Sequence, residues 1–164
     1  MIPLHRRPNI LASIHRSVNV IRLRGTRKTL PLCDGLEGLT EMKRTRILLA
    51  DDDLPMLAAT SRLLQTEFEV VGMVSDGHSL VEAAFTLLPD VIVTDISMPK
   101  MNGIEAVRKI RGTLSGIKCI FLTMHGAKGY RREAQSAGAA GYVLKSSARE
   151  ELKQAIHHAI QGSA

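Results

Sequence analysis

The chain has 164 residues, which suits one domain of typical size with some residues to spare. Apolar residues make up 45% of it, enough for a packed core, yet no apolar run approaches the roughly 18 residues that a membrane span requires. The net charge is +6, and residues 1–42 hold 7 Lys or Arg against 3 Asp or Glu. Because the remainder is close to balanced, charge alone gives no case for nucleic-acid binding.

Residues 1–42 differ from the rest of the chain in composition. They show no sustained periodicity and scatter Arg among Pro and Gly. An Arg-rich start of this kind can imitate a transit peptide or form a basic arm. We favour a disordered leader, or codons upstream of a true start at Met42, where a compact pattern begins at once. The folded domain is therefore expected over residues 43–164.

The cysteines give a first indication of compartment. Cys33 and Cys119 lie far apart in the sequence and predict no disulfide framework. Cys119 sits in an apolar run and is expected to be a small core residue. A reducing, cytoplasmic setting is the simpler expectation for such a chain.

From Thr45 onward, strand and helix patterns alternate five times. The first helix opens with Pro55, which is tolerated in a first turn. Ser79-x-x-Glu82 and Ser147-x-x-Glu150 are expected to cap the second and fifth helices. The third carries Ile104, Val107 and Ile110 on one face, and the fourth runs from about Lys128 to Ala137 before Gly138. The expected strands are Arg46–Ala50, Glu69–Val74, Asp90–Asp95, Ile117–Thr123 and Gly141–Leu144.

This alternation predicts the fold class. Strands that alternate with helices through short connections form a parallel sheet with helices on both faces. Five units fit a doubly wound α/β sheet far better than a barrel, which needs eight.

Polar residues gather where the expected strands end. Asp51, Asp52 and Asp53 follow the first strand, Asp95 ends the third, Thr123 ends the fourth and Lys145 follows the fifth. In a parallel sheet these ends share one edge, so the side chains should converge. Carboxylates from neighbouring strands can hold Mg²⁺, which prefers oxygen ligands. A Lys ammonium and a Thr hydroxyl can both pair with phosphoryl oxygens. We therefore interpret Asp95 as a nucleophile that accepts a phosphoryl group.

Each of these residues also has a purely structural explanation. Acids before a helix commonly interact with its dipole, and a lone Asp at a strand end is usually a turn or cap residue. An isolated Lys is usually solvated. The functional interpretation rests on all of them lying at one edge.

Five stretches of the chain resemble one known family, the receiver domain of two-component response regulators, and in particular its NarL/LuxR-type transcriptional subgroup. They are ILLADDD, FEVVGMVSDG, PDVIVTDISMPKMNGIEAVRKIR, IFLTMHG and AGAAGYVLKSSAREEL, and the resemblance as a whole runs from Thr45 to Gln161. The resemblance implies a flavodoxin-like sheet of strand order 2-1-3-4-5 with five helices. It also implies a sensor histidine kinase as the phosphoryl donor.

The resemblance assigns a role to each candidate residue. Asp95 is the phosphoacceptor, Thr123 the hydroxyl that turns toward the phosphoryl group, and Lys145 the cation that pairs with it. Asp51, Asp52, Asp95 and the backbone carbonyl of Ser97 hold Mg²⁺, with Asp53 as a helix cap. Tyr142 matches an aromatic position whose rotamer follows activation. A cis peptide is expected between Lys145 and Ser146, although such bonds cost about 3 kcal/mol without proline.

The resemblance also sets expectations about output. Phosphorylation is expected to change the face formed by the fourth helix, fifth strand and fifth helix, and to favour partner binding or a homodimer. The subgroup's C-terminal helix-turn-helix has no counterpart in these 164 residues, so we expect no direct DNA binding by the chain as it stands.

Two alternatives remain open from the sequence. One is an interaction module that no longer uses phosphorylation, and a lack of Mg²⁺ binding would favour it. The other is a phosphatase of the haloacid-dehalogenase type, which would want a second acid two residues after the nucleophile, where this chain has Ser97.

Overall fold

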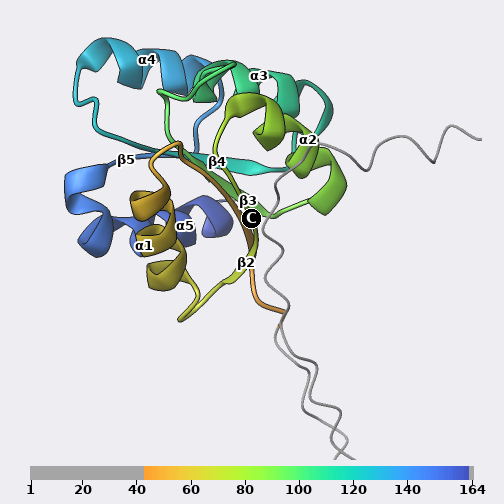
Figure 1. Ribbon diagram of the computed structural model, residues 1–164, viewed down its shortest axis with the longest axis vertical. Coiled ribbons are helices and arrows are strands. Elements are labelled where there is room, and N and C mark those ends of the chain that lie inside the picture. Colours follow the sequence, from red (N-terminus) through yellow and green to blue (C-terminus); the bar gives the residue numbers. More distant parts are fainter. Residues whose placement is uncertain (1–42, 163–164) are drawn as a thin grey trace, which may run out of the picture.

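A computed structural model of the chain describes residues 43–162. Within them lies a single sheet of five parallel strands, flanked by helices on both faces (Figure 1). The strand order is β2-β1-β3-β4-β5, as the family resemblance implied. The expectation of a leader at residues 1–42 lies outside the described residues.

The strands lie close to where the sequence placed them. They are β1 (Arg46–Ala50), β2 (Glu69–Val74), β3 (Val91–Thr94), β4 (Lys118–Thr123) and β5 (Gly141–Leu144). All four residues of β3 are buried, as expected for a central strand that is covered on both faces. Because β3 ends at Thr94, Asp95 lies just beyond the strand rather than in it as the sequence had predicted. The difference is one residue.

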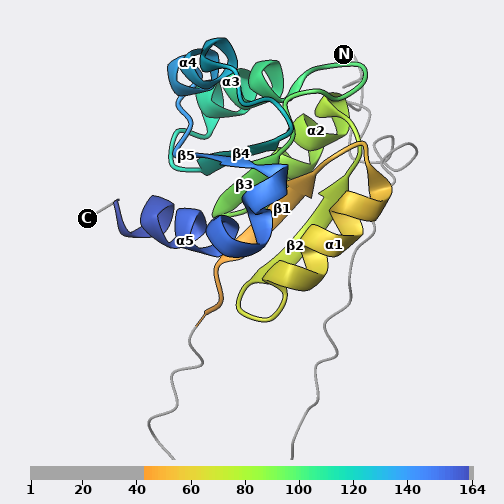
Figure 2. The same cartoon turned by 90° about the vertical axis from the view of Figure 1, so that its left-hand side faces the viewer.

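The helices form two layers around the sheet. They are α1 (Leu54–Leu64), α2 (Gly77–Leu87), α3 (Gly103–Thr113), α4 (Lys128–Ser136) and α5 (Ala148–Gln161). Figures 1 and 2 show α1 and α5 on one face, and α2, α3 and α4 on the other. Each layer has its own apolar core. Phe121 and Ile92 point into the core under α2 and α3, whereas Ile120 and Leu152 belong to the core under α1 and α5.

The helix starts confirm one expected cap and correct two. Asp53 caps α1 as expected, because its carboxylate accepts the N–H of Met56 at 3.0 Å. The box predicted at Ser79 is wrong. Helix α2 begins at Gly77, two residues before Ser79, and its N-cap is Asp76. The Asp76 carboxylate accepts both the N–H and the hydroxyl of Ser79.

Ser147 stands at the N-cap of α5 but does not cap it with its side chain. Its hydroxyl donates instead to the carbonyl of Leu144 at 3.3 Å, within a single 3₁₀ turn (Lys145–Ser147, η2) that leads from β5 into the helix. The cis peptide expected after Lys145 is also wrong, since no peptide bond among the described residues is cis. Ser146 lacks the tertiary amide that makes the cis form accessible to proline.

Two further findings concern the core and the helices. Cys119 is fully buried in the core, as predicted. In residues 43–162, none of the helices combines the length and apolar character that a membrane crossing demands.

Candidate functional site

The backbone places Asp51 and Asp95 side by side at the carboxyl edge of the sheet. The N–H of Asp51 donates to the carbonyl of Val74 at 3.1 Å, and the N–H of Asp95 donates to the carbonyl of Ala50 at 2.9 Å. These bonds extend the parallel ladder one residue beyond the strands. Both carboxylates are nearly buried, with 4% of Asp51 and 6% of Asp95 exposed.

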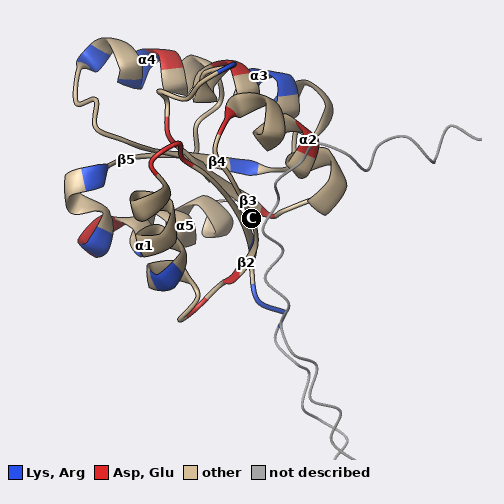
Figure 3. Cartoon of the chain, viewed as in Figure 1, with Lys and Arg blue, Asp and Glu red and all other residues tan. Residues whose placement is uncertain are grey.

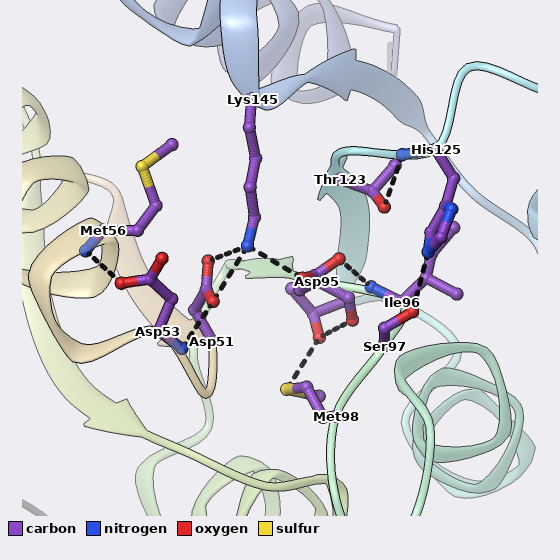
Figure 4. A network of polar contacts seen from close by, with 11 residues as sticks. Asp51, Asp53, Met56, Asp95, Ile96, Ser97, Met98, Thr123, His125 and Lys145 are labelled. Carbon is purple, nitrogen blue, oxygen red and sulfur yellow. Dashed lines mark hydrogen bonds and ion pairs between the residues drawn. The ribbon is translucent and has the colours of Figure 1, made fainter.

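Lys145 bridges these two carboxylates, although it lies 94 positions from Asp51 in the chain (Figure 4). Its Nζ lies 2.8 Å from Oδ2 of Asp51 and 2.8 Å from Oδ2 of Asp95. Burial alone would lower the pKa of Lys145, but the hydrogen bonds to both acids outweigh it and raise that pKa above its ordinary value. The side chain is therefore a fixed ammonium at the centre of the site.

Asp52 completes an acidic cluster. Asp51, Asp52 and Asp95 each offer a carboxylate oxygen, and these atoms all lie within 4.8 Å of one another. Figure 3 shows the acidic turn from β1 into α1. Burial raises the pKa of Asp51, and the hydrogen bond from Lys145 only partly offsets that effect. Three hard oxygen donors on an open edge fit Mg²⁺, which keeps several of its waters.

The turn after Asp95 holds its carboxylate in one orientation. Oδ1 accepts the N–H of Ile96 at 2.6 Å, while Oδ2 is paired with Lys145. Gly103, the first residue of α3, packs against the same turn. A Cβ there would lie 1.9 Å from the backbone carbonyl oxygen of Asp95, so only glycine allows α3 to begin this close to the acid.

Thr123 lies at the end of β4, beside β3, and is fully buried. Its hydroxyl oxygen accepts the N–H of His125 at 3.2 Å. Tyr142, in β5, donates its hydroxyl to the carbonyl of His125, and the Arg131 guanidinium lies 5.0 Å from the centroid of its ring. Burial raises the pKa of Tyr142, and Arg131 opposes the effect. Thr123 and Tyr142, the two residues expected to act as a switch, thus both bond to the backbone of His125.

Ser97 and His125 show what the sequence reasoning missed. Ser97 was selected only for its backbone carbonyl, yet its hydroxyl lies 2.8 Å from Nε2 of His125 (Figure 4). His125 was not selected at all. A signal was present, because each residue follows a site residue by two positions, Ser97 after Asp95 and His125 after Thr123, on neighbouring parallel strands.

These features define a doubly wound α/β domain with a lysine-bridged acidic site at the carboxyl edge of its sheet. Residues 47–157 match the family model described as "Response regulator receiver domain", and the chain belongs to that family. Receiver domains bind Mg²⁺ at an acidic pocket, and the aspartate cluster described above is such a pocket. The family assignment sets aside the phosphatase of the haloacid-dehalogenase type.

The similar proteins include response regulators and transcriptional regulators of the LuxR/NarL type. The chain is 39% identical over 124 residues to the "Uncharacterized transcriptional regulatory protein YxjL" of Bacillus subtilis, covering 74% of this chain and 56% of that protein. It is 36% identical over 118 residues to the response regulator UvrY of Escherichia coli, covering 71% and 54%. The chain thus spans about half the length of these relatives.

Solved structures show the same fold. The signal receiver domain of the response regulator NarL from Mycobacterium tuberculosis matches with a TM-score of 0.70 at 28% identity, over 73% of this chain and 98% of that one. A LuxR-family response regulator from Aurantimonas matches with the same TM-score at 34% identity, over 73% and 86%.

Proposed function

We propose that Asp95 accepts a phosphoryl group from a phosphohistidine of a sensor histidine kinase. An oxygen of the Asp95 carboxylate attacks phosphorus, the bond from phosphorus to the imidazole nitrogen breaks, and its electron pair stays with the imidazole. The observation that carries the proposal is that one buried lysine pairs with the two carboxylates that follow β1 and β3. Such an arrangement suits an anionic nucleophile that must meet an anionic donor.

The other residues of the site prepare Asp95 for that step. The acids Asp51, Asp52 and Asp95, with the Ser97 carbonyl, would hold Mg²⁺. A bound Mg²⁺ would neutralise charge on the phosphoryl oxygens. Lys145 remains close enough to pair with a phosphoryl oxygen once the group is attached.

We further propose that Thr123 and Tyr142 report phosphorylation. The Thr123 hydroxyl would turn to donate to a phosphoryl oxygen, pulling the β4–α4 segment toward the site. Because the Tyr142 hydroxyl donates to the carbonyl of His125 in that segment, the pull would reach β5 and α4. The α4–β5–α5 face would then shift toward a second arrangement that favours a partner or a homodimer.

The wider role follows from the relatives. We propose that the chain is the regulatory part of a cytoplasmic transcriptional regulator or a single-domain regulator, since the relatives named above are transcriptional regulators and response regulators. Self-phosphorylation from a small donor and self-dephosphorylation are the only reactions that we expect of the domain itself.

The test uses acetyl phosphate with Mg²⁺ and two matched variants. Asp95→Asn should abolish acid-labile phosphate uptake. Asp53→Asn is the control, because Asn caps a helix as well as Asp and residue 53 lies outside the acidic cluster. Labelling of the Asp95→Asn variant at the wild-type level would overturn the assignment of Asp95.

A further inference from the structure

The loop between β3 and α3 contains a three-residue turn with an unusual backbone. The N–H of Met101 donates to the carbonyl of Pro99 at 2.7 Å, and Lys100 between them has a φ of 64°. A hydrogen bond across one residue of positive φ is the pattern of a γ-turn, which is rare and strained. Among the described residues other than glycine, only Lys100 and Leu88 have a positive φ. Contacts from elsewhere in the fold must therefore hold this turn in place.

Two contacts hold the turn against the start of α2. Nζ of Lys100 lies 3.0 Å from Oδ2 of Asp76, which is the N-cap of α2. Beside that ion pair, a Cβ at Gly77 would lie 2.1 Å from the carbonyl oxygen of Met101. The first residue of α2 thus packs directly on the turn that leads into α3, and Figure 1 shows the two helices side by side.

Asp76 is a fixed partner for Lys100. Only 6% of Asp76 is exposed, and its carboxylate also accepts the N–H of Ser79 at 2.9 Å and the hydroxyl of Ser79 at 3.0 Å. Burial would raise the pKa of Asp76, but the hydrogen bonds from Ser79 and Lys100 outweigh it and lower that pKa. The carboxylate is therefore charged near neutral pH, and α2 already holds it in one orientation.

The anchored turn belongs to the loop that carries a proposed metal ligand. The base of this loop is closed, because the N–H of Gly103 donates to the carbonyl of Ile96 at 2.8 Å. Its far end is the turn at Lys100. Ser97 lies between these two points, and its carbonyl is the proposed backbone ligand of Mg²⁺. Since Mg²⁺ demands nearly ideal octahedral geometry, the direction of that carbonyl matters for binding.

We infer that the Lys100–Asp76 ion pair fixes the loop so that the Ser97 carbonyl points where Mg²⁺ requires it. Lys100 and Asp76 are thus positioning residues, and both lie outside the acidic cluster. Residues that orient a metal ligand affect metal affinity without binding the metal themselves. The inference rests on the proposed function, since it takes the Ser97 carbonyl as a ligand.

Charge and position predict opposite effects when Lys100 is removed. Loss of a positive charge from this loop should, by charge alone, tighten the binding of a divalent cation. If Lys100 acts by holding the loop, Lys100→Met should instead weaken Mg²⁺ binding. The expected loss is about threefold to fivefold, or about 0.6–1 kcal/mol at 25 °C. That is the range for an ion pair with one exposed partner, and 64% of the Lys100 side chain is exposed.

Further variants separate the ion pair from the backbone of the turn. Lys100→Arg keeps a cation for Asp76, and Asp76→Asn removes the charge but keeps an oxygen that can cap α2. Lys100→Gly loses the ion pair but removes the Cβ that disfavours a positive φ. It should therefore keep or raise the free energy of unfolding while it weakens Mg²⁺ binding. Lys109→Met is the matched control, since Lys109 is an exposed lysine on α3.

Mg²⁺ titrations followed by nuclear magnetic resonance of the backbone amides measure the affinity, and urea denaturation without Mg²⁺ measures the stability. We expect Lys100→Met and Asp76→Asn each to weaken Mg²⁺ binding by the stated factor, and the double variant to lose no more than either alone. Lys100→Arg and Lys109→Met should bind Mg²⁺ like the wild type. Equal or tighter binding by Lys100→Met would overturn the inference, as would losses that simply multiply in the double variant.

Phosphoryl uptake from acetyl phosphate supplies a second readout. Lys100→Met should need more Mg²⁺ for half-maximal uptake but should reach the wild-type rate at saturating Mg²⁺, because Asp95 and Lys145 are unchanged. A rate that stays low at saturating Mg²⁺ would contradict a role confined to the metal. A wild type that binds no Mg²⁺ would refute the proposed function, whereas a wild type and variants that bind it equally well would refute the positioning role alone.

Discussion

Removing Lys145 should destabilise the protein through repulsion between the carboxylates it now separates. In Lys145→Met, Asp51 and Asp95 would face each other without a cation, together with Asp52. Carboxylate oxygens of these acids lie within 4.8 Å of one another. At an effective dielectric constant of about 20, two unit charges 4.8 Å apart repel by about 3.5 kcal/mol. We therefore expect the free energy of unfolding to fall by roughly 2–4 kcal/mol near neutral pH.

The pH dependence identifies the cause of that loss. Burial raises the pKa of Asp51 above its ordinary value even in the wild type, where Lys145 opposes that effect, so the loss of Lys145 should raise the pKa of Asp51 further. A carboxyl group with a raised folded pKa destabilises the protein above that pKa and stops doing so as the pH falls through it. The difference in the free energy of unfolding between wild type and variant should thus be largest near neutral pH and should narrow as the pH falls through the raised pKa of Asp51.

Mg²⁺ should act in the same direction as a proton. Added Mg²⁺ should restore more stability to Lys145→Met than to the wild type, and should bind the variant more tightly, even though phosphorylation is weakened. Urea denaturation followed by circular dichroism, at two pH values and with and without Mg²⁺, measures all of these differences.

The control substitution is Lys153→Met. Lys153 lies 3.7 Å from Glu67 in a half-exposed pair far from the site, so its loss should cost less than about 1 kcal/mol. If the loss in Lys145→Met were independent of both pH and Mg²⁺, the repulsion argument would be wrong.

Three further predictions test separate parts of the structure. Asp53→Ala should lower the free energy of unfolding by about 1 kcal/mol, because the N–H of Met56 loses its acceptor; an unchanged denaturation midpoint would contradict the cap. Gly103→Ala should cost at least about 2 kcal/mol and slow phosphoryl uptake, since the new Cβ meets the Asp95 carbonyl oxygen at 1.9 Å; a variant with wild-type stability and uptake would show that α3 need not start so close. Burial raises the pKa of Cys119 to about 12, so its thiol should resist alkylation in the native protein and react in urea; rapid native labelling would mean that the core opens there.

Much of the fold could be predicted because its signals are local and repeated. Runs such as Val91–Thr94 mark buried strands, and Leu152 and Ile156 mark the inward face of α5. The convergence of Asp51, Asp95 and Lys145 followed from topology, because parallel strands that end in polar residues share one edge. The structure adds the contacts themselves, since Nζ of Lys145 lies 2.8 Å from Oδ2 of each of the two acids.

The errors arose where several local solutions compete. Ser79 fits a capping box, but the Asp76 carboxylate three residues earlier bonds both its N–H and its hydroxyl. Ser147 occupies the expected position, yet the 3₁₀ turn brings the Leu144 carbonyl within reach of its hydroxyl. Such choices depend on turn geometry that no spacing rule specifies.

The spacing could have placed Ser97 and His125 near each other, but the other contacts of His125 could not be predicted, for a different reason. Its partners come from the turn after β3, the end of β4, strand β5 and α4. Each contact depends on rotamers and on the path of the β4–α4 segment, and neither is encoded by periodicity.

The most direct test of the proposed function is to locate the phosphoryl group on the wild-type protein. After incubation with acetyl phosphate and Mg²⁺, borohydride reduces an acyl phosphate to an alcohol, and mass spectrometry of peptides identifies the reduced residue. We predict reduction at Asp95 alone. Reduction at Asp51 or Asp52 instead, or no reduction anywhere in a chain that binds Mg²⁺, would contradict the assignment of Asp95 as the phosphoacceptor.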